Sequence, residues 1–162
     1  MGSRRAELLA ARIQEGAAAL AAFVSGLSES EWGTATSPTD RRTVGQIVNH
    51  VALVYPIEIE LARSIASGKA VTDVSWQVVA DLNANHAREN GTPTKAAARE
   101  LLSRNSRQAA DAVRAFSDAE LDQAAPFSLS YGAPVTAQFV VEDHALRHSW
   151  HHLARIRAAV GR

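Results

Sequence analysis

Apolar residues recur every three or four positions through most of the chain, which is the spacing that places side chains on one face of an α-helix. Leu9, Ile13 and Leu20 follow this spacing near the N-terminus. The pattern predicts helices at residues 3–24, 43–68, 75–89, 94–116 and 136–160. Pro56 falls inside the second helix and is expected to kink it, because its ring clashes with the preceding turn. Four of the helices are long with short connections, which predicts an all-α four-helix bundle.

Small polar residues, glycine and proline mark the breaks between these helices. The sequence Asn-Gly-Thr-Pro at 90–93 interrupts the apolar pattern. Residues 28–32 (SESEW) and 117–120 (SDAE) have the spacing of capped turns, so each is expected to form a short additional helix. Residues 125–134 are expected to form a loop with room for a brief extended pair, and Thr136 is expected to cap the last helix.

Length and composition are typical of one folded domain that covers residues 1–162. Hydrophobic residues make up 46% of the chain and charged residues 21%, and the formal net charge is zero. This balance argues against disorder and gives no broad electrostatic attraction to nucleic acid or to an anionic membrane. We therefore expect neither of these partners.

Charged residues also decide how the alanine-rich N-terminal segment is interpreted. Glu7, Arg12 and Glu15 interrupt it, so it lacks the continuous apolar region of a signal peptide. No stretch of the chain is expected to be apolar enough to cross a bilayer. A cytoplasmic location is the resulting expectation.

Candidate chemistry is concentrated in histidine, because the chain has no cysteine for a disulfide, a thiolate zinc site or a nucleophile. Four of the six histidines lie in HALRHSWHH, residues 144–152. On a helix, His144, His148 and His152 share one face at intervals of four residues. Two histidines at this spacing can bind one cation through their ring nitrogens. The spacing fits the pair 144 and 148 as well as the pair 148 and 152.

A third ligand has to come from another helix, and His50 is the candidate. It lies one turn after Ile47 and one turn before Val54, near the apolar face of its helix, where an unpaired polar group is costly. A single histidine in such a place is more often a core residue bonded to a neighbour. Two apolar helix faces that both carry histidines favour a shared divalent metal ion.

Two segments resemble the DinB/YfiT-like superfamily of metal-binding four-helix bundles. HSWHHLARIR is similar to the closing helix of that superfamily, and TVGQIVNHV is similar to its first histidine-bearing helix. The order of the SESEW turn, the NHV helix, the SDAEL turn and the final helix covers nearly the whole chain. The resemblance implies His50, His148 and His152 as ligands of one metal ion. It also implies that His144 lies beside the ligands or in the pocket, and that His151 points away.

The resemblance also implies a type of chemistry. Three imidazoles leave an open coordination position, which is typical of a catalytic site, and a bound metal lowers the pKa of a water or thiol. Relatives use mycothiol, bacillithiol or glutathione, so we expect a low-molecular-weight thiol S-transferase or isomerase with a small thiol and an electrophile as substrates. Mycothiol-dependent maleylpyruvate isomerases replace one HxxxH histidine by glutamate, and this chain keeps both.

Other interpretations remain open from the sequence. A non-enzymatic, metal-stabilised binding or stress-response module is the main alternative, and a haem-binding bundle is a weaker one. Imidazole ligands suit zinc, nickel, iron and copper, and we expect one divalent ion of zinc, nickel or iron. Relatives in the superfamily are often dimers, so the resemblance implies a homodimer. The chain carries no GxGxxG, P-loop, GxSxG or HExxH motif, which leaves nucleotide binding and those hydrolase mechanisms without support.

The remaining candidate residues are expected to be structural. Large aromatic side chains more often pack in a core than line a pocket. The aromatic residues assigned to the core on this basis are Tyr55, Trp76, Tyr131 and Trp150. Glu58, Glu60 and His86 are expected to face solvent.

Overall fold

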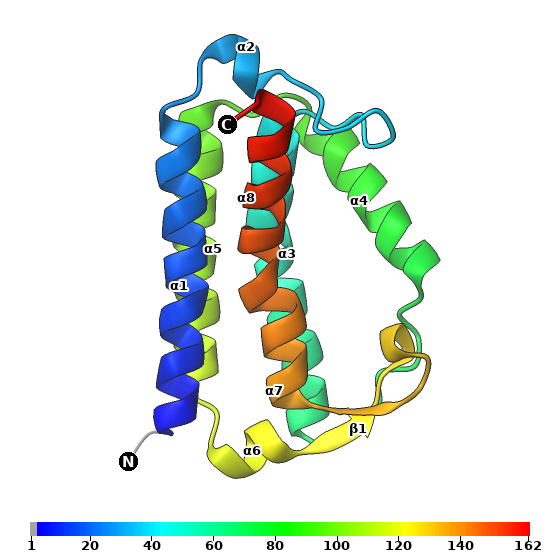
Figure 1. Ribbon diagram of the computed structural model, residues 1–162. Coiled ribbons are helices and arrows are strands. Elements are labelled where there is room, and N and C mark those ends of the chain that lie inside the picture. The colour runs from blue at the N-terminus through cyan, green and yellow to red at the C-terminus, as the bar shows by residue number, and fades with distance from the viewer. Residues whose placement is uncertain (1–2) are drawn as a thin grey trace.

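The computed structural model describes residues 3–162, so Met1 and Gly2 of the predicted domain lie outside the described residues. Four long helices run side by side (Figure 1). They are α1 (Arg4–Ser25), α3 (Val44–Ala66), α5 (Lys95–Arg114) and a C-terminal helix composed of α7 (Ala137–Val140), a π-helical segment (Val141–Leu146) and α8 (Arg147–Val160). The predicted four-helix bundle is confirmed. Thr136 caps the C-terminal helix as expected, because its hydroxyl accepts a hydrogen bond from the amide of Phe139.

Short elements connect the long helices at the places that the sequence indicates. They are α2 (Glu29–Trp32), α6 (Asp118–Asp122), and the antiparallel strands β1 (Ala124–Pro126) and β2 (Pro134–Thr136). Ser28 and Ser117 each begin a capping box, in which the serine hydroxyl and a glutamate three residues later exchange hydrogen bonds with the backbone. The two predicted turns and the brief extended pair are therefore present.

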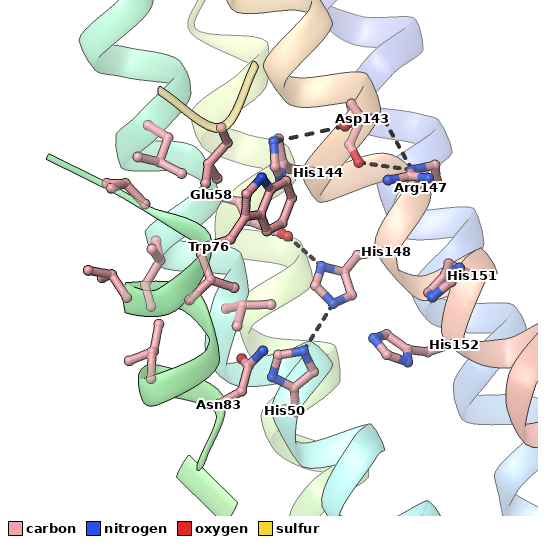
Figure 2. Close-up of a pocket in the computed structure, with 18 of the residues that line it drawn as sticks. His50, Glu58, Trp76, Asn83, Asp143, His144, Arg147, His148, His151 and His152 are labelled. Atoms are coloured by element: carbon pink, nitrogen blue, oxygen red, sulfur yellow. Dashed lines mark hydrogen bonds and ion pairs between the residues drawn. The ribbon is translucent and has the colours of Figure 1, made fainter. Parts of the chain in front are cut away.

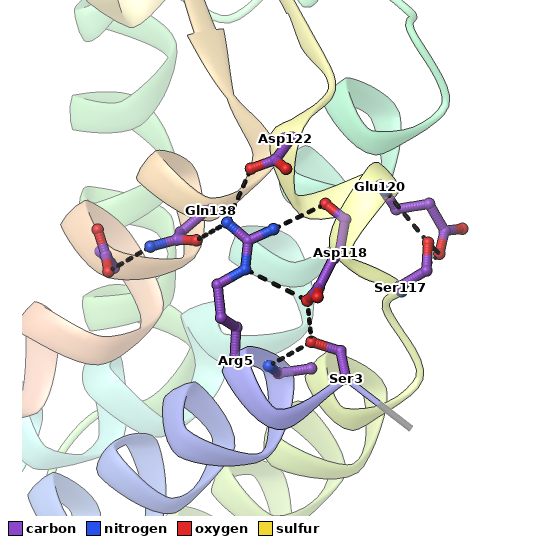
Figure 3. A network of polar contacts seen from close by, with 9 residues as sticks. Ser3, Arg5, Ser117, Asp118, Glu120, Asp122 and Gln138 are labelled. Carbon is purple, nitrogen blue, oxygen red and sulfur yellow. Dashed lines mark hydrogen bonds and ion pairs between the residues drawn. The ribbon is translucent and has the colours of Figure 1, made fainter. Parts of the chain in front are cut away.

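A polar network ties α6 to the start of α1 (Figure 3). The guanidinium of Arg5 donates to Asp118 at 3.2 Å and to Asp122 at 2.8 Å, and Ser3 donates to the same Asp118 carboxylate. Gln138 of α7 accepts a longer bond from Arg5 at 3.4 Å. These groups are exposed, so the network adds little stability but connects three elements at one end of the bundle.

The core lies between the four long helices. α1 packs along α5, α5 along α3, and α8 against both α1 and α3. The largest fully buried apolar side chains are Ile13, Leu20, Ile47, Tyr55, Ile65, Leu102, Leu121, Phe127, Leu153 and Ile156. Because they come from α1, α3, α5, α6, α8 and the segment between β1 and β2, removing apolar surface from water stabilises the bundle as a single unit.

α1 differs from the sequence-based expectation in its apolar character. By length and composition alone it could cross a membrane, so the expectation that no stretch is apolar enough is wrong for this helix. Leu9, Ile13, Leu20 and Val24 of α1 are buried in the core of the bundle. Core helices pass the same test of length and composition, because both environments select apolar side chains.

α4 (Trp76–Asn90) matches the predicted third helix but stands apart from the bundle (Figure 1). None of its side chains, all within the described part of the chain, is fully buried. Trp76 is 57% exposed and Tyr131, in a tight turn, is 94% exposed, so the expectation that both pack in the core is wrong. Tyr55 is buried as expected, while Trp150 remains 39% exposed. The apolar side of α4 instead faces a cavity.

Pro56 lies inside α3, which stays helical on both sides of it. A proline has no amide hydrogen, so the carbonyl of Ala52, four residues earlier, loses its usual partner. The buried side chain of Asn105 on α5 donates to this carbonyl at 2.8 Å. The tertiary structure thus replaces the hydrogen bond that the sequence removes, as buried carbonyl groups require.

We expect Asn105→Ala to lower the free energy of unfolding by about 1–3 kcal/mol, because it leaves the buried Ala52 carbonyl without a partner. In a Pro56→Ala background the same substitution should cost less, since residue 56 then supplies an amide to that carbonyl. Urea denaturation of the four proteins measures the difference. An equal cost of Asn105→Ala in both backgrounds would contradict this explanation.

Candidate metal centre

Three imidazoles from two helices meet inside the bundle (Figure 2). His50 comes from α3, and His148 and His152 come from successive turns of α8. Their ring centroids are 5.1 Å apart for His50 and His148, 5.4 Å for His50 and His152, and 4.8 Å for His148 and His152. One ring nitrogen of each lies within 4.8 Å of the others. The structure therefore brings together the three residues that the resemblance implies.

Glu58 fixes the orientation of His148. Its Oε1 lies 2.5 Å from Nδ1 of His148, and its side chain is 6% exposed. A carboxylate oxygen accepts, so the hydrogen is assigned to Nδ1 and the lone pair to Nε2. That Nε2 faces Nε2 of His50 at 3.1 Å. A carboxylate behind a histidine is the usual outer partner of a metal-binding imidazole.

The expectation that Glu58 faces solvent is wrong. His50 and Glu58 are eight residues apart, so they fall on the same inward face of α3, two turns apart. Helical periodicity alone therefore indicates that Glu58 lies on the inward face of its helix. The carboxylate is tolerated there because α8 provides a histidine N–H opposite it, and this depends on the packing of two helices.

The separation of the ring nitrogens suits a metal ion. Two nitrogens bound at 2.0–2.1 Å to a tetrahedral ion lie about 3.3 Å apart, close to the 3.1 Å between His50 and His148. Burial, and then the nearby His148, lowers the pKa of His50 to about 2, and the same causes lower the pKa of His152. Both rings are therefore neutral near pH 7 and keep a lone pair for a metal. Among residues 3–162, Nδ1 of His50 and Nδ1 of His152 have no hydrogen-bond partner.

His144 lies on the same helix but outside this cluster. It belongs to the π-helical segment, which ends at Leu146, before α8 begins. A π turn contains an extra residue, so side chains before it lose the four-residue register with those after it. The ring of His144 instead packs edge-on against Phe127, with centroids 5.6 Å apart. Hence His148 and His152, not His144 and His148, converge on His50.

Two other histidines complete the set. His151 is exposed and lies beside the cluster, with its centroid 5.0 Å from that of His152 (Figure 2). His86 of α4 was expected to face solvent, and this is wrong, because it is half-buried and its Nδ1 is covered. The sequence of α4 gave no sign of this, since the surface that covers His86 belongs to another part of the chain.

A cavity of about 400 Å³ leads from α4 to the three histidines. Its apolar wall includes Val54, Ile57 and Leu61 of α3 and Trp76, Val79 and Leu82 of α4. The ion pair between Arg147 and Asp143, at 3.2 Å, also lines it. This volume is typical of pockets that bind small molecules. Sequence reasoning missed the cavity because an apolar stripe on a helix looks the same whether it covers a core or a pocket.

We expect Glu58→Gln to weaken zinc binding about 10-fold, because the amide holds Nδ1–H of His148 less strongly than the carboxylate does. Glu60→Gln is the matched control, since Glu60 is exposed on the same helix. Competition with a chromophoric chelator measures both affinities. Equal affinities for Glu58→Gln and the wild type would show that the carboxylate does not support the site.

Both the sequence and the fold are similar to those of known proteins. The model of the DinB superfamily matches residues 12–156. The fold is similar to that of YfiT from Bacillus subtilis, described as a probable metal-dependent hydrolase with an unusual four-helix bundle topology. The TM-score is 0.74 at 17% sequence identity, and the match covers 98% of this chain and 90% of that chain. No curated protein matches the chain.

Proposed function

The chain belongs to the DinB superfamily, and from this premise we propose that it is a metal-dependent enzyme that transfers a low-molecular-weight thiol to an apolar electrophile. The observation that carries the proposal is a cluster of three imidazoles that borders an apolar cavity, in a chain that has no cysteine. A thiol nucleophile for such a site has to come from a bound molecule. The match of family and fold agrees with the resemblance found in the sequence.

His50, His148 and His152 would hold one divalent ion, with zinc, nickel and iron as the candidates. Such an ion lowers the pKa of a thiol or water that reaches its open coordination position. Imidazoles are neutral ligands, so they leave the full positive charge of the ion to act on that group. The Glu58 carboxylate keeps His148 in the tautomer whose Nε2 can bind.

The cavity supports an apolar electrophile as the second substrate. Most of the six wall residues named above are aliphatic, and Trp76 adds an indole that is 57% exposed. Covering these side chains with an apolar molecule removes their surface from water and excludes water from the reacting atoms. In the transfer, the thiol sulfur bonds to an electrophilic carbon, the leaving group departs with the bonding electron pair, and the thiol proton passes to solvent.

The direct test is conjugation of mycothiol, bacillithiol or glutathione to monochlorobimane by the zinc-, nickel- or iron-loaded protein. We expect turnover with at least one thiol, and a loss of more than about 100-fold in His148→Ala, since a lost ligand should cost more than a lost outer partner. Arg63→Ala is the control, because this side chain is exposed on α3. Equal rates for the wild type and His148→Ala would refute the proposal.

Other outcomes of the same experiment point to different functions. Strong thermal stabilisation by metal without turnover of any thiol would favour the non-enzymatic binding or stress-response module. Metal-dependent hydrolysis of p-nitrophenyl acetate, with no turnover of any of the three thiols, would favour water as the nucleophile, in line with the description of YfiT. Either result would overturn thiol transfer as the reaction.

We expect Trp76→Ala to raise the KM for monochlorobimane several-fold, because the indole lines the cavity. Zinc affinity should stay unchanged, because Trp76 does not belong to the histidine cluster. Gln77→Ala, on the neighbouring exposed position of α4, is the control. Steady-state kinetics with saturating thiol measure the effect. An unchanged KM in Trp76→Ala would remove α4 from the substrate site.

A further inference from the structure

A second, much smaller cavity also borders His50 and lies between α3 and α4. Its volume is about 10 Å³, which is close to the space that one water molecule needs. Apart from Ala87, every residue that lines it carries a polar group: Arg42, Gln46, Asn49 and His50 from the α3 side and Asn83, His86 and Asn90 from α4. Apolar cavities of this size stay dry, whereas polar ones with several partners hold water.

Three buried polar atoms belong to residues that line this cavity and have no hydrogen-bond partner within residues 3–162. They are Nη1 of Arg42, Nδ1 of His50 and Nδ1 of His86. Buried polar groups are nearly always paired with protein or with ordered water, so three such atoms on residues that line one small cavity call for a partner there.

Arg42 is held so that Nη1 is its free nitrogen. Its Nε and Nη2 donate to the two carboxylate oxygens of Asp40 at 2.9 and 2.8 Å. Arg155 of α8 donates to the same carboxylate at 3.1 Å. The hydrogen bond from Arg42 lowers the pKa of Asp40 to about 2. The Asp40 carboxylate that orients Arg42 therefore stays charged at neutral pH.

We propose that one water molecule occupies this cavity, bonded to Arg42 Nη1, His50 Nδ1 and His86 Nδ1, and that His86 thereby positions His50 as a metal ligand. The inference rests on the metal site of the proposed function. It assigns α4 a role in that site through a residue that does not contact the metal. An outer partner of this kind fixes the tautomer and orientation of a ligating imidazole.

Water fits because the role of His50 Nδ1 reverses when metal binds. Because Nε2 of His148 accepts in its contact with His50, Nε2 of His50 carries the hydrogen and Nδ1 is an acceptor. When Nε2 binds a metal, the hydrogen moves to Nδ1, which becomes a donor. Water can donate in the first state and accept in the second, while Arg42 donates to it in both. A chloride ion could only accept, so it would suit the second state alone.

The first test is zinc affinity, measured by chelator competition. We expect His86→Ala to weaken binding about 10-fold or more, and His86→Asn to restore most of it, because an amide can again bond to the water. Asn85→Ala is the control, since this neighbour on α4 is exposed. His86→Ala is expected to fold normally, because α4 contributes no fully buried side chain, within the described chain, to the core. Unchanged zinc affinity in His86→Ala would overturn the inference.

A second measurement does not need metal binding. In ¹⁵N NMR spectra of the zinc-free protein, His50 should show hydrogen on Nε2 and a hydrogen-bonded Nδ1. In His86→Ala, the Nδ1 resonance of His50 should move towards that of a free imidazole nitrogen. If the protein binds no zinc, the proposed function fails while this shift still tests the water. An identical His50 resonance in the zinc-free wild type and His86→Ala would refute it.

Discussion

The arrangement of this protein depends on burying polar rings between two apolar helix faces. His50 and Glu58 on α3 face His148 on α8, and the chain of contacts from Glu58 through His148 to His50 joins the two helices. An isolated imidazole or carboxylate in this place would be costly, so each requires the other helix at the correct height and rotation. A divalent ion would satisfy the same requirement more completely, because each ring could give it a lone pair.

The helices that supply most of the apolar core differ from the helix that lines the cavities. α1 and α5 pack on each other and on the remaining long helices, and they supply much of the apolar core without contributing to the histidine cluster. α4 does the reverse, because it adds nothing fully buried among its described side chains but provides one wall of the large cavity and part of the small one. Changes on α4 should therefore alter binding more than folding.

Both helices that carry the cluster depart from regular α-helical hydrogen bonding close to it. Pro56 lies between His50 and Glu58, and Asn105 supplies the hydrogen bond that the proline cannot. The π-helical segment ends two residues before His148 and removes His144 from its register. Such irregularities are costly in isolation and are often found beside functional sites. Here each one helps to determine which side chains reach the cluster.

The sequence by itself determined the helices, their caps and the short turns, because these depend on periodicity and local hydrogen bonding along one segment. Periodicity also placed His50 near an apolar helix face and His148 in a pair with His144 or His152, while the resemblance implied His152. The sequence also excluded a protein thiol. Only the tertiary structure decided that His152, not His144, joins His148, since the π turn cannot be read from residue spacing. It also decided that Glu58 is buried and that Trp76 lines a cavity. Periodicity defines which side chains share a face of a helix, but what lies opposite that face depends on how distant segments pack.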